Sequence, residues 1–154
     1  MGRMAKMMRK LAAGLLACAL SGMLPAQAGP MAGLWKTFSD RSGELESLVR
    51  IVDNLGHLEG RIEKIFSPPA PTPNPLCDLC HGDNKDKPVV GMVILHALVS
   101  AIDPQRADGD ILDPDDGKVY KLKLHTLEGG DKLEVRGFLG ISLLGRTEIW
   151  LRQE

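Results

Sequence analysis

Hydrophobic and polar positions after residue 29 alternate with the short period of β-strands, and we find no convincing stripe with the spacing of an amphipathic helix. Between residues 118 and 126, Tyr120, Leu122 and Leu124 alternate with charged residues, which is typical of a strand with one buried face. Gly, Asp and Pro, which favour turns, separate these runs. We predict strands over residues 33–38, 45–53, 57–66, 89–99, 111–112, 118–126, 132–138 and 146–152.

Three segments complicate this pattern. Residues 89–99 are apolar nearly throughout, which predicts a buried strand with a possible bulge at Gly91, although a buried helix has the same pattern. Residues 103–110 are rich in Asp, so we predict a loop there. Residues 67–88 hold six prolines, which lack the backbone donor that a central strand needs, and this predicts a long, stiff crossing loop.

About eight short strands of even spacing predict an all-β fold, either an up-and-down antiparallel barrel or a sandwich. Closing the sheet would remove the exposed edges that otherwise favour aggregation. A barrel of eight strands can be filled with side chains or can hold one small ligand.

The first 28 residues have the organisation of a secretory signal peptide. Residues 1–10 are basic, Leu11 to Leu24 is an apolar run, and an A-x-A cleavage site ends at Ala28. We predict cleavage near Ala28, a periplasmic or secreted bacterial location, and a mature domain over residues 29–154. A short membrane anchor is one alternative, and a lipoprotein modified at Cys18 is another.

Composition fits one globular domain, with 44% hydrophobic and 25% charged residues. Without the leader the chain has 15 basic and 20 acidic residues and a net charge of -5, so it lacks a positive surface for nucleic acid or anionic lipid. Six aromatic residues are too few for a base-stacking surface. We expect no nucleic-acid partner and no stable membrane insertion after cleavage.

A family resemblance rests on four groups of residues. They are Gly33 to Thr37, Gly91 to Leu95, Ile111 to Pro114 with Gly117 to Tyr120, and Leu133 to Gly137 continuing from Gly140 through Thr147 to Trp150. These residues resemble the secreted bacterial domain-of-unknown-function family 2147, and the resemblance covers nearly all of residues 32–153. It implies a single lipocalin-like up-and-down barrel and no enzyme activity, and it supplies no catalytic residue.

The G-x-W of the first strand and an Arg on the last also resemble the wider lipocalin and fatty-acid-binding superfamily. That resemblance implies that Arg152, or alternatively Arg146, packs over Trp35 at the closed end of the barrel. Such a cation–π contact would join the two ends of the chain and contribute roughly 0.5 to 2 kcal/mol.

Cys77 and Cys80 belong to a C-x-x-C-H motif that ends at His81. In an oxidising compartment, within a Pro-rich loop, the interpretation that we adopt is a structural disulfide. The same motif attaches c-type haem, and a thioredoxin-like redox pair or a zinc site with His81 and Asp83 are further alternatives. We expect no cofactor and no metal. Asp103, Asp108, Asp110, Asp113, Asp115 and Asp116 also suggest calcium, but their spacing does not match an EF-hand loop.

Charged residues in the middle of strands, such as Arg50, Glu63, Glu134 and Arg136, have two interpretations. They point outward on half-exposed strands, or some of them point inward. On the second interpretation, the possible ligand cavity is lined by Arg50, Glu63, Tyr120 and Arg136, which would hold an amphipathic head group.

These observations predict a non-enzymatic periplasmic or secreted protein that binds a small apolar or amphipathic molecule in its barrel. A haem or thiol redox protein built on Cys77 and Cys80 is the first alternative. A structural envelope-interaction domain with a filled barrel is the second.

Overall fold

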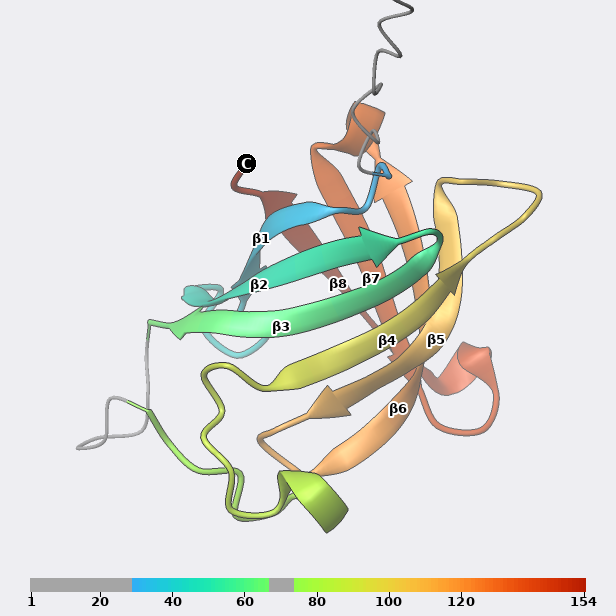
Figure 1. The fold of residues 1–154 in the computed structure, drawn as a ribbon. Coiled ribbons are helices and arrows are strands. Elements are labelled where there is room, and N and C mark those ends of the chain that lie inside the picture. The colour runs from blue at the N-terminus through green and yellow to red at the C-terminus, as the bar shows by residue number, and fades with distance from the viewer. Residues whose placement is uncertain (1–28, 67–73) are drawn as a thin grey trace, which may run out of the picture.

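The computed structural model describes residues 29–66 and 74–154, which form one closed barrel of eight antiparallel strands (Figure 1). Neighbouring strands follow chain order, and β1 pairs with β8 to close the sheet. This confirms the predicted lipocalin-like all-β barrel. The predicted leader lies outside the described residues. The strands are β1 (Gly33–Phe38), β2 (Leu45–Asn54), β3 (His57–Ile65), β4 (Val93–Val99), β5 (Arg106–Asp113), β6 (Lys118–Leu127), β7 (Lys132–Phe138) and β8 (Arg146–Arg152).

The fifth strand corrects the sequence prediction, because most of the expected Asp-rich loop belongs to β5. Buried and exposed residues do alternate along β5, since Ala107 is buried and Asp108 is exposed, but the inward-facing residues are small and give a weak hydrophobic pattern. Gly109 lies opposite Ala97 of β4, where a Cβ on Gly109 would overlap the neighbouring backbone. Small residues therefore face inward where strands β4 and β5 come close, and acids face the solvent.

The fourth strand is shorter than predicted and begins at Val93, and the helical alternative is wrong. Gly91 adopts a φ of 95° in the preceding loop. The strand irregularity falls at Ile94 instead, since Gly60 of β3 pairs with Leu95 while Arg61 pairs with Val93.

Large apolar side chains fill the barrel interior. Trp35, Leu95, Leu122, Leu133 and Trp150 each expose 3% or less of their surface. In the part of the chain that the structure describes, three short 3-10 turns lie outside the strands, η1 (Gly82–Asn84), η2 (Glu128–Gly130) and η3 (Ser142–Leu144). Over the described ranges, no helix is long and apolar enough to cross a membrane.

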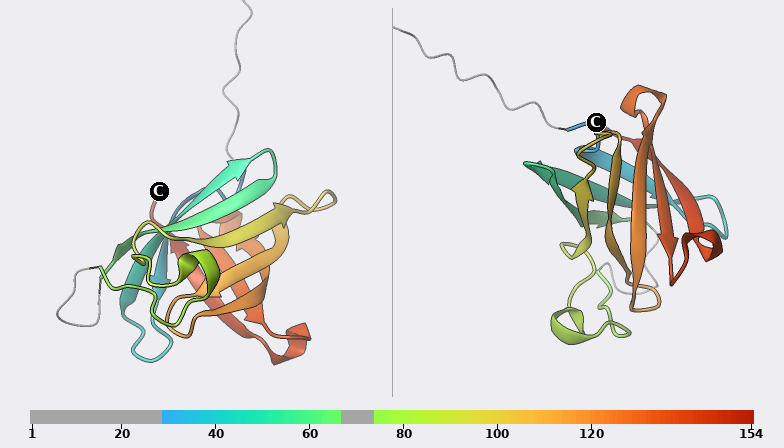
Figure 2. Two further views of the ribbon diagram at one scale, coloured as in Figure 1. Left: turned by 60° about the horizontal axis from the view of Figure 1, so that its bottom comes forward. Right: turned by 90° about the vertical axis from the view of Figure 1, so that its right-hand side faces the viewer.

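The two ends of the barrel differ. At the end that holds both chain termini of the domain, Arg152 lies over Trp35, and we call this the closed end (Figure 1). We call the opposite end the mouth. It is bordered by the β1–β2 turn, residues 74–92, the β5–β6 turn and the β7–β8 connection, and residues 74–92 lie across part of it (Figure 2).

Candidate functional site

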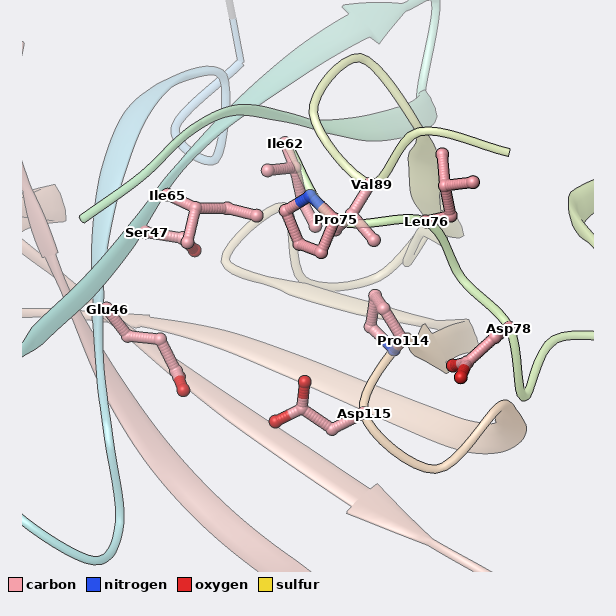
Figure 3. Close-up of a pocket in the computed structure, with 10 residues that line it drawn as sticks. All are labelled: Glu46, Ser47, Ile62, Ile65, Pro75, Leu76, Asp78, Val89, Pro114 and Asp115. Carbon is pink, nitrogen blue, oxygen red and sulfur yellow. The ribbon is translucent and has the colours of Figure 1, made fainter. Parts of the chain in front are cut away.

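A pocket of about 480 Å³ lies at the mouth, between strands β2 and β3, residues 74–92 and the β5–β6 turn (Figure 3). Its lining combines aliphatic and proline side chains with carboxylates. Ten residues line it: Glu46, Ser47, Ile62, Ile65, Pro75, Leu76, Asp78, Val89, Pro114 and Asp115. The barrel therefore has a recess beside its filled interior, open to solvent at one end.

The apolar wall of this pocket joins β3 to the loop that follows it. Ile62 and Val89 expose only 5% and 7% of their surface. Backbone hydrogen bonds hold the two segments together, because Gly91 N–H donates to Ile62 O at 2.8 Å and Val89 N–H donates to Pro75 O at 2.9 Å. The loop adds wall to the pocket without adding strands, which proline would oppose.

A β-bulge places Glu46 at the pocket. Thr37 of β1 pairs with Ser47, but Phe38 pairs with Leu45, so Glu46 is the extra residue on β2. A bulged residue is free of the regular in–out alternation, and its side chain can be aimed differently from those of its neighbours. Figure 3 shows Glu46 and Asp115 on one side of the pocket, across from the aliphatic side chains.

The carboxylates at the mouth raise each other's pKa values. Glu46 remains exposed to solvent, yet the surrounding protein removes part of its hydration. That desolvation, followed by repulsion from Asp115, Glu148 and Asp113, raises the pKa of Glu46. Burial likewise raises the pKa of Asp113, against the opposing effect of a hydrogen bond from Asp115 N–H. At the mouth, burial and mutual repulsion therefore disfavour the ionised form of these carboxylates, and Arg146 offsets this only in part.

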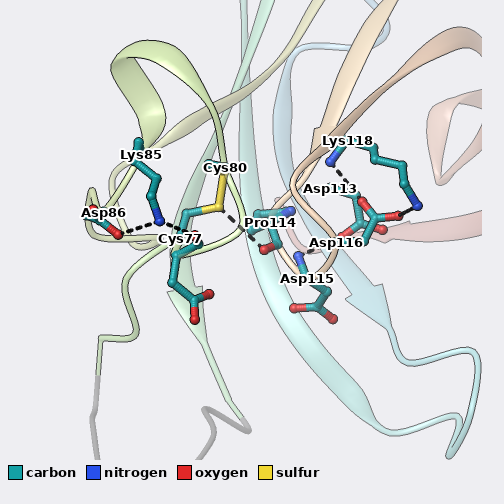
Figure 4. The surroundings of a disulfide bond; sticks show 10 residues. Cys77, Cys80, Lys85, Asp86, Asp113, Pro114, Asp115, Asp116 and Lys118 are labelled. Carbon is teal, nitrogen blue, oxygen red and sulfur yellow. Dashed lines mark hydrogen bonds and ion pairs between the residues drawn. A yellow bond between two sulfur atoms is a disulfide. The ribbon is translucent and has the colours of Figure 1, made fainter.

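The predicted disulfide between Cys77 and Cys80 is present, with a Cα–Cα distance of 5.3 Å, and both residues are 1% exposed. It packs against the β5–β6 turn, where Cys77 Sγ lies 3.4 Å from Pro114 O (Figure 4). A Cβ on Gly117 in that turn would overlap the backbone of Leu79. The disulfide therefore fixes the loop segment that carries Leu76 and Asp78 to the pocket.

The disulfide bears directly on the alternatives for the C-x-x-C-H motif. Both sulfurs are bonded to each other, so in this form neither can attach haem or ligate zinc. His81 is exposed and precedes η1. Within the described part of the chain, no group of three or more His, Cys, Asp or Glu side chains is arranged to hold a metal ion.

Four of the six Asp residues that suggested calcium have structural roles. Asp103, Asp110 and Asp116 form ion pairs with Arg106, Lys121 and Lys118. The side chains of Asp103, Asp113 and Asp116 also accept hydrogen bonds from backbone N–H groups in their own turns. Turn capping, the structural role that Asp often has, accounts for Asp103, Asp113 and Asp116.

Three of the four residues predicted for a possible ligand cavity lie on the outer face of the barrel, so this prediction is wrong for them. Arg50 Nε donates to Glu63 Oε1 at 2.8 Å, and both side chains are more than a third exposed. Arg136 donates to Thr147 Oγ1 at 2.6 Å on the outside of β7 and β8. Arg50 and Arg136 alternate with buried neighbours, such as Val49 and Val135, which take the inner positions, whereas Glu63 is the extra residue of a β-bulge on β3.

Tyr120, the fourth residue, lies on the inner face with Leu122 but outside the pocket lining. Its hydroxyl donates to Asp116 Oδ2 at 2.5 Å.

The predicted closing pair is present, with the Arg152 guanidinium carbon 4.2 Å from the centroid of the Trp35 ring. Arg146, the alternative partner, lies at the mouth. It contacts Asp40 at 2.9 Å and Glu148 at 2.6 Å.

Sequence reasoning missed Glu46, Asp78 and Asp115 as pocket residues. The signal for Asp115 was a strong turn sequence, which is structural in most proteins. No sequence signal marks the bulge that positions Glu46, since a bulge depends on which residue lies opposite on the neighbouring strand.

Comparisons with known proteins agree with this architecture. Residues 33–152 match the family model described as "Uncharacterized protein conserved in bacteria (DUF2147)". No curated protein matched the chain. One similar solved structure is protein HP1028 from the human pathogen Helicobacter pylori, described as belonging to the lipocalin family. It is 16% identical with a TM-score of 0.66, covering 80% of this chain and 83% of that one. At that identity the likeness shows the fold alone.

Proposed function

We propose that this chain, which belongs to the bacterial family DUF2147, is a non-enzymatic binding protein that holds one small apolar or amphipathic molecule at the mouth of its barrel. The proposal is carried by the pocket of about 480 Å³, whose aliphatic wall adjoins carboxylates. A concave site with an apolar wall and a few polar groups is the usual form of a small-molecule site.

The filled interior supports binding at the mouth in preference to deep binding. Leu58, Leu95 and Leu122 are 1% exposed or less inside the barrel, so a ligand placed there would have to displace core side chains. Ile62 and Ile65, by contrast, contribute to the pocket wall.

The lining also supports binding without chemistry. Ser47 is the one hydroxyl among the ten lining residues, and its Oγ lies 2.8 Å from Thr37 Oγ1 in a hydrogen bond. A serine nucleophile requires an adjacent general base instead. The remaining lining residues are aliphatic residues, prolines and carboxylates.

Titration with the neutral fluorescent probe N-phenyl-1-naphthylamine tests this function. We expect saturable binding at one site, because the probe is apolar and the pocket wall is aliphatic. Ile65→Trp should fill the pocket and weaken binding, whereas Ile102→Trp, in a turn where Ile102 is 96% exposed, should leave it unchanged. Absence of saturable binding, or equal binding by both variants, would refute the proposal.

We also propose that the protein is exported, cut near Ala28, and works in the periplasm or outside the cell. The Cys77–Cys80 disulfide supports an oxidising compartment. Intact mass of the unreduced exported protein tests this: residues 29–154, lighter by two hydrogens, is the expected result. Added lipid with cleavage before Cys18, or an intact leader, would contradict it, and an added haem would favour the alternative function.

A further inference from the structure

We propose that the mouth pocket selects ligands with a positively charged head group and a short apolar tail, such as alkylammonium ions, over fatty acids and other anionic amphiphiles. This inference rests on the proposed function, because it concerns the ligand class of the same pocket.

The charge of the lining is one-sided. Glu46, Asp78 and Asp115 contribute carboxylates, and none of the ten lining residues is Lys, Arg or His. An anionic head group in this pocket would therefore meet carboxylates, and the nearby Arg146, which lies outside the lining, offsets their charge only in part.

Three basic side chains near the mouth, those of Arg146, Lys118 and Lys85, already have carboxylate partners. Arg146 bridges Asp40 and Glu148, with N–O distances of 2.9 and 2.6 Å. Lys118 lies 3.1 Å from Asp116 in the β5–β6 turn. Recruiting either cation to an anionic ligand would break an existing ion pair.

Lys85, in the disulfide loop, is likewise engaged, 3.0 Å from a carboxylate oxygen of Asp86 (Figure 4).

Glu46 is the group best placed to meet a cationic head. Its carboxylate makes no hydrogen bond or ion pair with any residue that the structure describes. It shares the lining with Ile62 and Ile65, so a cation beside Glu46 would leave its tail against the aliphatic wall. Head and tail of one small amphiphile thus find complementary groups within a single recess.

Repulsion among the acids adds to this preference. Asp115 and Asp113 both disfavour ionisation of Glu46. A bound cation would offset that repulsion, whereas a neutral ligand would leave it unchanged. Selectivity should therefore come from the head group, while the tail contributes affinity without regard to charge.

Isothermal titration of the exported protein, with its disulfide intact, tests the inference with three probes that share one tail. Octyltrimethylammonium, octyl glucoside and octanoate carry a positive, a neutral and a negative head. We expect the affinity to fall in that order at neutral pH and low salt, and the preference to shrink as salt is added.

Variants locate the effect. Glu46→Gln and Asp115→Asn should each weaken octyltrimethylammonium binding about two- to fivefold, the range for a solvent-accessible ion pair, and leave octyl glucoside unchanged. Glu134→Gln is the matched control, because Glu134 lies on the outer face of β7 opposite Ile149. Equal binding by all three probes, or preference for octanoate, would overturn the proposed charge selectivity but would leave the proposed binding function of the pocket intact. No binding of any probe would overturn the proposed function itself.

Discussion

At the scale of single residues, Arg152 connects the C-terminal strand of the barrel domain to the N-terminal segment of the same domain. Its guanidinium lies over Trp35 and also donates to the carbonyl oxygens of Gly130, Ala32 and Pro30, at 2.6, 2.8 and 2.6 Å. Only the planar, five-donor guanidinium can stack on a ring and reach three carbonyls together. Arg152 thereby links the strand that closes the barrel to the segment before β1.

We predict that Arg152→Lys lowers the free energy of unfolding by about 1 to 2 kcal/mol, because an ammonium keeps the charge but loses the fork of donors. Urea unfolding followed by tryptophan fluorescence measures the change. Arg106→Lys is the control: Arg106 forms one exposed ion pair with Asp103, so its replacement should cost less than about 0.5 kcal/mol. Equal losses in the two variants would show that the closing contacts contribute nothing particular.

The closing pair was predictable and the pocket acids were not. Trp35 and Arg152 were identified from a family resemblance, which gives the position of a residue in a known fold. Glu46 depends on a bulge that arises from the pairing of β1 with β2, a long-range property absent from the local sequence. Arg50 and Arg136 show the opposite error: they have the charge that a ligand site needs, but strand alternation places their side chains on the outer face of the barrel.

At the scale of elements, β5 shows how local composition can hide a strand. Asp residues favour turns, and this preference outweighed the weak alternation of Ala107 and Gly109 with Asp108 and Asp110. Pairing partners decide the outcome, since Asp110 lies opposite Lys121 of β6 and forms an ion pair with it at 2.7 Å. The well-patterned β6 and β8, by contrast, were predicted to within a residue.

Gly117 joins two elements, and we predict that Gly117→Ala is far more destabilising than Gly129→Ala. Both glycines have positive φ, 71° and 69°, so each substitution should cost about 1 to 2 kcal/mol in backbone strain. At Gly117 the new Cβ would also overlap the backbone of Leu79, whereas at Gly129 it would meet nothing within 4 Å. Thermal unfolding of both variants measures the difference, and equal melting temperatures would mean that the disulfide loop does not rest on this turn.

The disulfide should hold the pocket wall in place more than it stabilises the barrel. The double variant Cys77→Ser, Cys80→Ser opens a very short loop, so we expect a loss of about 2 kcal/mol in the free energy of unfolding. Binding of N-phenyl-1-naphthylamine should weaken as well, because Leu76 and Val89 lie on the segment that the disulfide anchors. Unchanged binding together with lower stability would show that the disulfide loop does not position the pocket wall.

At the scale of the whole molecule, the sequence predicts the barrel but not where it is hollow. Eight alternating strands predict a barrel or a sandwich, the family resemblance implies the barrel, and buried residues such as Leu95 and Leu133 fill its centre. The recess exists because one connection is long, rich in proline and fixed by a disulfide, so that it overhangs the mouth without closing it (Figure 2). Such a recess depends on how a loop without regular structure packs, and periodicity carries no information about that.

The carboxylates at the mouth lead to a last prediction, which concerns how stability and ligand binding depend on pH. Burial and repulsion raise the pKa of Glu46 and of Asp113, so the folded protein binds their protons at a higher pH than the unfolded chain does. Their contribution to stability therefore grows as pH falls through the folded-state pKa values, and is lost as pH rises again.

Cation binding should show the opposite trend, because it favours the ionised carboxylates. Octyltrimethylammonium affinity should fall as pH is lowered, beginning above the usual titration range of glutamate, while octyl glucoside affinity stays level. The groups that face Glu46 are Asp113, Asp115, Glu148 and Arg146, and the arginine keeps its charge throughout. Glu46→Gln should flatten the profile, and Glu134→Gln should preserve it. A wild-type profile as flat as that of Glu46→Gln would show that these carboxylates do not meet the ligand.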